Sequence, residues 1–228
     1  MTRASREIEF KFGVDGKHAF LRLVQQLDLP AYLLDHGVRQ TNHFFDSTSH
    51  CLHTNHLAIR LREEDAYHFL TIKGGQPSKA DADSVLTDRV EEEVTLSQET
   101  ALALLSGKLS PVQVIRQQFE SKSRSIVQLV NAACGDEKLA PVGRFHNIRI
   151  HLPPVVLPAG GSDEAIVFEL DTSTFPDGRT DYEFEIEISE HSDAVAIKNA
   201  LLGLFKQAGI DWHTAPSKAE RFYAALNQ

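Results

Sequence analysis

The sequence predicts an α+β protein in which a closed antiparallel sheet of eight strands encloses a tunnel and helices flank its outside. The first observation is that three stretches far apart in the chain, residues 7–12, 89–94 and 182–188, alternate charged with apolar side chains. Alternate residues of a β-strand share a face, so each stretch would place charges on one side of a sheet and mostly apolar groups on the other. The second observation is that strand-like segments between these stretches carry basic residues with the same spacing. A sheet that closes on itself can turn all these charged faces inwards.

Strand-like segments, separated by turn and helix signals, follow one another along the chain. Strands are expected at residues 7–12, 38–45, 57–63, 67–73, 89–95, 144–152, 165–171 and 181–189. Helices are expected at 17–27, within 97–134, at 193–207 and at 216–226, with starts at Ser97, at Pro111 and around Ser123. The mostly polar stretch 79–87 predicts a mobile loop, and 153–164 predicts either a cap over one tunnel mouth or a loose loop. Neither a repeat nor a composition shift divides the chain, so one domain over residues 1–228 is expected.

Composition and charge exclude several classes of protein. With 228 residues and 42% hydrophobic content, the chain is long enough to bury a full core. A net charge of -9 argues against a general nucleic-acid binder, which would carry a basic surface. Only two cysteines, Cys51 and Cys134, predict a reducing compartment without a disulfide framework. No apolar run has the length of a membrane span, and the first strand follows without a hydrophobic signal segment, so we expect a cytoplasmic protein with no membrane partner.

The acidic rows are more crowded than an ordinary exposed strand would require. By default, one charged face of an antiparallel sheet simply faces water, and each stretch taken alone fits that interpretation. Carboxylates that stand close together, however, disfavour each other's charged forms, and a bound divalent metal ion is a common remedy. The rows place these acids on shared faces: Glu7 with Glu9, Glu91 with Glu93, and Glu183 with Glu185 and Glu187.

The basic residues provide the complementary half of the pattern. Arg60 and Arg62 lie two apart and share a strand face, Lys73 ends the next strand, and Arg149 stands between apolar neighbours. One interpretation is that these residues form surface ion pairs, which add little stability. If they instead face inwards with the acids, six strands line a charged lumen. A triphosphate chelated by Mg²⁺ or Mn²⁺ would match such a lumen, because Arg pairs bidentately with phosphate oxygens and carboxylates bind hard metal ions.

The ordered set of these motifs resembles the CYTH domain superfamily, also called triphosphate tunnel metalloenzymes. Residues 7–11 match its ExExK signature, and residues 89–93 resemble its RxExE strand. The other similar segments are the aromatic-Asp segment 42–46, the two-arginine strand 57–62, the strand 70–73 that ends in Lys73, the basic strand with Arg149, the acidic segments 170–171 and 182–185, and the C-terminal helix 216–222 with Lys218. The resemblance covers nearly the whole chain and keeps the family's order.

The resemblance implies a metal-dependent hydrolase of inorganic triphosphate or a small organic triphosphate, acting as a monomer or homodimer. Glu7, Glu9, Glu183 and Glu185 would hold Mg²⁺ or Mn²⁺, and the phosphate clamp would consist of Lys11, Arg60, Arg62, Lys73, Arg149 and Lys218. Glu91 and Glu93 would either complete the metal shell or orient the basic residues, and Asp171 is equally open. The residues expected to be catalytic are Glu7, Glu9, Lys11 and Lys73.

Some features depart from the family or leave other functions open. Asn147 stands where the family often has a second basic residue, which removes part of the phosphate grip. His43, His50, His53 and His56 crowd around Cys51, but their spacing fits no standard zinc motif. Two other functions use the same lumen: a class IV type adenylate cyclase, and a non-catalytic binder of polyphosphate or nucleotide.

Overall fold

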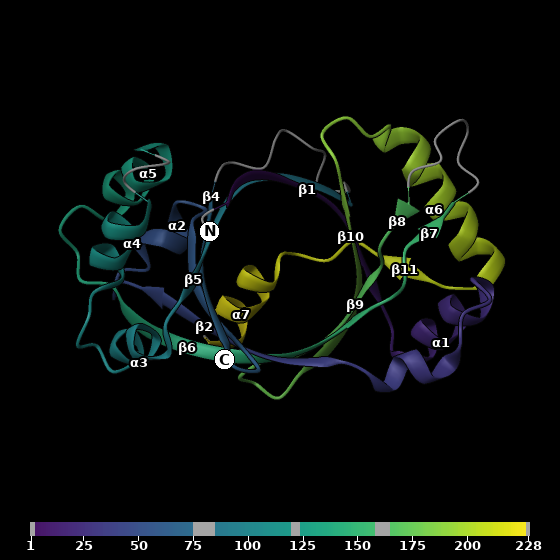
Figure 1. Cartoon of the computed structure of the whole chain (residues 1–228), viewed down its shortest axis with the longest axis horizontal. Helices are drawn as coiled ribbons and strands as arrows, with labels where there is room; N and C mark the ends of the chain where they lie inside the picture. Colours follow the sequence, from purple (N-terminus) through teal and green to yellow (C-terminus); the bar gives the residue numbers. More distant parts are fainter. Residues whose placement is uncertain (1–2, 75–84, 120–123, 158–164, 227–228) are drawn as a thin grey trace.

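The wall of the molecule is a closed ring of antiparallel strands, which appears end-on in Figure 1. The computed structural model describes residues 3–74, 85–119, 124–157 and 165–226. Neighbouring strands follow the order β10, β9, β6, β2, β3, β4, β5, β1, and β1 pairs with β10 to close the ring. Their bounds are β1 Arg3–Val14, β2 Val38–Asp46, β3 Ala58–Glu64, β4 Tyr67–Gly74, β5 Leu86–Leu96, β6 Ala140–His151, β9 Glu169–Thr174 and β10 Thr180–Ile188. The predicted eight-stranded tunnel with flanking helices is therefore confirmed.

Three short strands lie outside this ring. β11 (Trp212–His213) pairs with the end of β1, and β7 (Val155–Val156) pairs with β8 (Ala165–Ile166) in a separate hairpin. The strand expected at 165–171 is thus divided between β8 and β9. The segment 153–164 was expected to be a cap over one tunnel mouth or a loose loop, and its residues 158–164 lie outside the described residues. The loop expected at 79–87 also lies outside them as far as residue 84, and its last two residues belong to β5.

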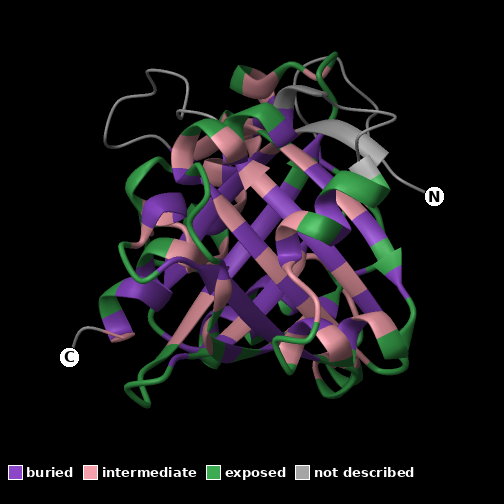
Figure 2. Ribbon diagram, turned by 90° about the vertical axis from the view of Figure 1, so that its left-hand side faces the viewer, coloured by how far each residue is buried: buried purple, intermediate pink, exposed green. Residues whose placement is uncertain are grey.

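Alternation along the strands separates the inside of the ring from the outside. In β1, Phe10 and Phe12 are completely buried against the flanking helices, while Glu9 and Lys11 point to the inside. Figure 2 shows the same change of burial from one residue to the next along the strands. The period-two pattern of the sequence therefore predicted correctly which residues of this strand face the tunnel.

Helices cover the outside of the ring in two groups (Figure 1). α1 (Lys17–Gln26) and α6 (Ala194–Ala208) pack on the apolar face of β1 and β10, with Phe20, Phe184 and Phe205 at the centre. On the opposite side, the group consists of α2 (Cys51–Thr54), α3 (Gln98–Leu105), α4 (Pro111–Phe119) and α5 (Arg124–Cys134). Ser97 caps α3 by accepting a hydrogen bond from the N–H of Thr100 at 3.2 Å, as predicted. Within the described ranges, no helix combines the length and apolar character needed to cross a membrane.

The C-terminal helix α7 (Lys218–Leu226) lies within the outline of the ring in Figure 1. Phe222 stacks on Phe44 of β2, with ring centroids 4.7 Å apart, and also contacts Phe145 of β6. These rings, together with Phe175, form a third apolar cluster. This apolar cluster therefore occupies part of an otherwise charged interior. Because it holds α7 inside the ring, the first residue of α7, Lys218, reaches the tunnel.

Cys51 and Cys134 form a disulfide, so the prediction that the chain lacks one was wrong. The two residues are 83 positions apart in sequence, but their Cα atoms are 5.3 Å apart. The reason is that α5 packs against α2, and both cysteines lie in the buried apolar cluster between the helices and the ring. A cysteine count carries no information about this helix contact, which is why the sequence alone did not reveal the pair.

Candidate active site

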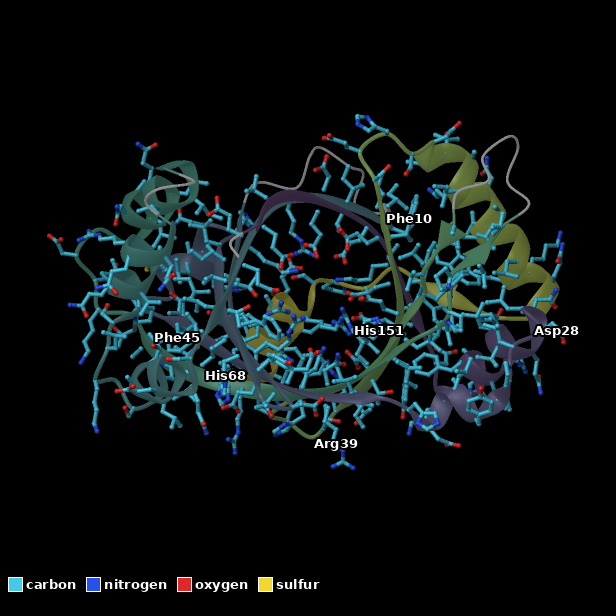
Figure 3. The ribbon with its side chains drawn as sticks, in the orientation of Figure 1. Phe10, Asp28, Arg39, Phe45, His68 and His151 are labelled. Atoms are coloured by element: carbon cyan, nitrogen blue, oxygen red, sulfur yellow. A yellow bond between two sulfur atoms is a disulfide. The ribbon has the colours of Figure 1, made fainter. Side chains whose placement is uncertain are left out.

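The ring encloses a cavity of about 330 Å³ whose wall is mostly charged. Figure 3 shows nitrogen and oxygen atoms crowding the inside of the ring, whereas carbon-rich side chains fill the space between the wall and the flanking helices. The lining includes these predicted site residues: Glu7, Glu9, Lys11, Arg60, Arg62, Lys73, Glu91, Glu93, Arg149, Glu185 and Lys218. Glu183 is buried behind this lining, next to α7.

On one side of the cavity, β1, β4 and β5 interleave acids with bases. The strand register places Glu7 opposite Arg89, and Lys73 opposite Glu91. Lys73 Nζ lies 3.0 Å from Glu7 Oε1 and 2.7 Å from Glu91 Oε2, and Arg89 Nη2 lies 2.7 Å from Glu9 Oε1. Burial raises the pKa of Glu91, but the positive charges of Lys73 and Arg60 and the side-chain hydrogen bonds of Glu91 together outweigh it and lower the pKa below its usual value. These acids are therefore closely spaced and held by cations.

On the other side, the charges are more deeply buried and each has several partners. Glu185 lies 2.8 Å from both Lys11 Nζ and Lys218 Nζ and also pairs with Arg149. Asp171, which is completely buried, accepts hydrogen bonds from Arg149 Nε at 2.9 Å and from Lys218 Nζ at 2.7 Å. Burial opposes ionisation of Glu185, but Lys11 and Lys218 hold its pKa well below the usual range. Glu185 and Asp171 are thus buried carboxylates that are each held by several cations.

Three of these carboxylates could act together as metal ligands. Among the described residues, one group of possible ligand atoms lies within 4.8 Å of one another, and its members are Asp171, Glu183 and Glu185. Carboxylate oxygens suit the hard ions Mg²⁺ and Mn²⁺, so the donor set fits such an ion. These oxygens also pair with cations: Glu183, for example, pairs with Lys218 and Arg221.

Two arginines on β3, Arg60 and Arg62, have weaker contacts with described carboxylates than the other arginines of the cavity lining. Arg60 forms no ion pair with any described carboxylate; its hydrogen bond is to Thr71 Oγ1 at 3.4 Å, and its Nε has no hydrogen-bond partner. Arg62 has only long contacts, 3.4 Å to Glu93 and 3.5 Å to Glu64. Burial and the neighbouring charge of Arg60 lower the pKa of Arg62. Two adjacent guanidinium groups that line a cavity in this state are suited to bind an anion such as phosphate.

Comparison with known families agrees with this geometry. Residues 5–223 match the family model of the CYTH domain. The chain belongs to the CYTH domain family. Among curated protein sequences, no relative matches it.

Several solved structures share the architecture of this CYTH domain. A putative adenylyl cyclase from Hippeastrum, described as having a dominant triphosphatase activity, is 24% identical, with 96% of this chain and 95% of that chain covered and a TM-score of 0.72. A putative adenylate cyclase from Bacillus halodurans is 25% identical, with 96% and 98% covered and a TM-score of 0.65. A protein from Pyrococcus horikoshii is 12% identical, with 97% and 99% covered and a TM-score of 0.57.

The sequence left several charged residues of the CYTH cavity without a role. Arg89, Glu169 and Glu187 line the cavity. Arg89 and Glu187 belong to the predicted charged rows but received no role, whereas Glu169 was not singled out, although it lies two positions from Asp171 and the period-two pattern could have identified it. Glu169 pairs with Arg149, yet burial raises the pKa of Glu169 to about 7. Arg221 was also missed, although it lies three positions after Lys218 and thus near it on the surface of α7.

Asn147, the departure from the usual CYTH pattern, belongs to a buried hydrogen-bond network. Its Nδ2 donates to Gln40 Oε1 and to Asp171 Oδ1, both at 2.9 Å, and its Oδ1 accepts from Ser173 Oγ at 3.0 Å. Asn147 is not among the residues that line the cavity. Its role is therefore to hold Asp171 in place.

The histidines around Cys51 are not arranged as a zinc site. Cys51 is bonded to Cys134, so it offers no thiolate. His53 stacks on Tyr223 with ring centroids 4.1 Å apart, and His43 contacts Glu63 at 3.0 Å. His50 and His53 thus belong to the packing between α2 and Tyr223 of α7.

Proposed function

We propose that this CYTH domain is a divalent-metal-dependent hydrolase of inorganic triphosphate or a small organic triphosphate, and that it acts inside the charged cavity. The observation that carries the proposal is that one cavity contains both weakly paired arginines and closely spaced carboxylates. Arg60 has no ion pair with a described carboxylate and Arg62 has only long ones, while carboxylates crowd the rest of the wall. A polyanion would satisfy the arginines, and a divalent cation would satisfy the carboxylates that the polyanion leaves without their basic partners.

In this proposal the basic residues bind the substrate and stabilise charge. The clamp consists of Lys11, Arg60, Arg62, Lys73, Arg149 and Lys218. Phosphoryl transfer needs positioning and stabilisation of the charge that grows on the leaving group, and fixed cations in an enclosed site supply both. Lys73 and Lys11 are assigned the catalytic part of this role because each also contacts the acids of β1.

The acids of the wall are proposed to hold the metal ion. They are Glu7, Glu9, Glu91, Glu93, Glu183 and Glu185, with Asp171 near the last two. When bound, Mg²⁺ or Mn²⁺ would supply a Lewis acid for phosphoryl oxygens and lower the pKa of a bound water. Glu7 and Glu9 are assigned catalytic roles because they share one strand face with Lys11 and contact its basic neighbours.

A class IV type adenylate cyclase is the second candidate, because structures described as putative adenylate cyclases share the fold. A cyclase must also hold adenine, for which an aromatic or apolar surface is needed. Phe44 is the only aromatic residue in the described lining of this cavity, where Ala58 and Ala219 are the other apolar members. The lining therefore favours a substrate that is mostly phosphate.

Product analysis distinguishes the candidates. The purified protein is incubated with Mg²⁺ or Mn²⁺ and either tripolyphosphate or ATP. Release of orthophosphate and pyrophosphate from tripolyphosphate supports the hydrolase. Cyclic AMP and pyrophosphate from ATP would establish the cyclase, and tight binding without turnover would establish a non-catalytic binder. A small triphosphate, rather than nucleic acid, is the proposed partner in view of the net charge of -9. The oligomeric state, monomer or homodimer, stays a prediction.

Arg60→Ala is expected to weaken substrate binding while leaving the fold as stable as before. A charge-assisted hydrogen bond to phosphate contributes enough that KM for tripolyphosphate should rise roughly 10- to 100-fold. The free energy of unfolding should stay the same or increase, because Arg60 has no ion pair with a described residue and its removal relieves a desolvated charge. Steady-state kinetics and urea unfolding measure the two effects.

The matched control is Arg179→Ala, which removes an arginine whose side chain is 44% exposed, away from the cavity lining. It should leave KM unchanged. An unchanged KM in Arg60→Ala as well would show that this arginine does not bind phosphate.

A further inference from the structure

A buried hydrogen bond joins α7 to the end of β2. The phenol of Tyr223 donates to Asp46 Oδ2 at 2.8 Å, and both side chains are almost completely buried. The same carboxylate accepts from the backbone N–H groups of Leu52 at 2.9 Å and His53 at 3.1 Å, at the start of α2. Burial and the hydrogen bond to Asp46 raise the pKa of Tyr223, so the phenol keeps its proton and remains a donor.

α7 has a second polar contact with the opposite part of the ring. Arg221 Nη1 donates to Asp181 Oδ2 of β10 at 2.9 Å, and Arg221 also pairs with Glu183. β9 and β6 separate β10 from β2 in the sheet, so the helix bridges two strands that are not neighbours. The apolar stacking of Phe222 on Phe44 lies between these contacts.

The two polar contacts restrict α7 more than its apolar packing does. Stacked rings attract one another without a strict direction and allow a helix to turn or slide slightly. A hydrogen bond with a buried, charged acceptor requires a particular distance and angle. Tyr223 and Arg221 therefore both restrict the rotation of a nine-residue helix whose first residue, Lys218, belongs to the cavity lining.

We propose that Tyr223 and Asp46 are positioning residues for Lys218: their hydrogen bond sets the orientation of α7, and thereby the place at which Lys218 Nζ meets the triphosphate. This inference rests on the proposed function, in which Lys218 is part of the phosphate clamp. Neither Tyr223 nor Asp46 lines the cavity, so their effect on the substrate must pass through α7.

A double-mutant cycle tests the proposal. Tripolyphosphate binding and turnover are measured for the full-length wild type, Tyr223→Phe, Lys218→Ala and the double variant. Tyr223→Phe keeps the ring and removes the donor, so Kd and KM should rise roughly tenfold, a typical coupling between interacting residues, with kcat nearly unchanged. In the Lys218→Ala background, the same substitution should have almost no effect. Tyr182→Phe is the matched control, because it removes a phenol whose ring packs on Phe20 in the apolar cluster that includes α1 and α6.

An equal loss in both backgrounds, or no loss in either, would overturn the proposal, since Tyr223 would then act on the fold alone or not at all. Should Tyr223→Phe fail to fold, Asp46→Asn provides the same cycle with a residue of nearly the same shape. Crystal structures of wild type and Tyr223→Phe give a readout without substrate: Lys218 Nζ should leave its position 2.7 Å from Asp171 Oδ2. If the wild type neither binds nor hydrolyses tripolyphosphate, the proposed function fails, and an unmoved Lys218 separately contradicts the positioning.

Discussion

Glu9→Gln is expected to reduce metal-dependent turnover of tripolyphosphate by at least about 100-fold. Glu9 is a proposed metal ligand, and the loss of a direct ligand should lower activity more than the loss of a residue that only orients a ligand. Glu9 is 6% exposed and lies 3.3 Å from Lys11 Nζ and 2.7 Å from Arg89 Nη2. Gln keeps the shape but removes the charge that pairs with these cations and that is proposed to bind the metal ion. The measurement is the rate of orthophosphate release as a function of Mg²⁺ or Mn²⁺ concentration.

The fold should survive this substitution, since Lys11 keeps its ion pair with Glu185 at 2.8 Å and Arg89 keeps Glu7 at 3.2 Å. Glu190→Gln is the matched control, because the side chain of Glu190 is 62% exposed and lies outside the cavity lining. Wild-type turnover by a folded Glu9→Gln protein would exclude Glu9 as a metal ligand.

Reduction of the Cys51–Cys134 disulfide is expected to lower the free energy of unfolding by about 4 to 5 kcal/mol, the chain-entropy value for a closed loop of this length. The loop spans 83 residues, so cutting it greatly enlarges the number of conformations open to the unfolded chain. Urea unfolding with and without a reductant, combined with thiol titration of the native protein, measures the effect.

The variant Cys51→Ala/Cys134→Ala serves as the control, because a reductant should not change its unfolding midpoint. Two titratable thiols in the native protein, or identical midpoints for the wild type in both conditions, would contradict the disulfide.

Much of the ring follows from local patterns in the sequence. The alternation at Glu9, Phe10 and Lys11 specifies both the strand and the face that turns inwards, because one residue of shift would bury charges among the phenylalanines of the outer core. The same rule places Arg60 and Arg62 in the cavity. The predicted ring and its charged interior therefore rest on a property that each strand carries by itself.

Contacts between elements distant in sequence could not be predicted in this way. The partner of Cys51 depends on the packing of α5 on α2, and the partner of Tyr223 depends on how α7 enters the ring. Neither helix carries a local signal that specifies its neighbour. The ion pairs inside the cavity also depend on contacts between distant elements. Which acids pair with Lys218 is determined by the strand register and by the position of α7 together.

Closure of the ring joins its first strand in the sequence to its last, and this has a consequence for how the protein folds. The final seam pairs β1 with β10, from Ile8 opposite Ile188 to Val14 opposite Tyr182. Pairings between such distant residues are slow to form, because the chain between them must lose conformational entropy before the contacts that stabilise the pairing are made. During synthesis, one edge of β1 therefore stays open until β10 has emerged, and an open edge is a template for pairing with other chains. The strand that carries the first acids of the cavity is thus also the one most exposed to misassembly before the ring is complete.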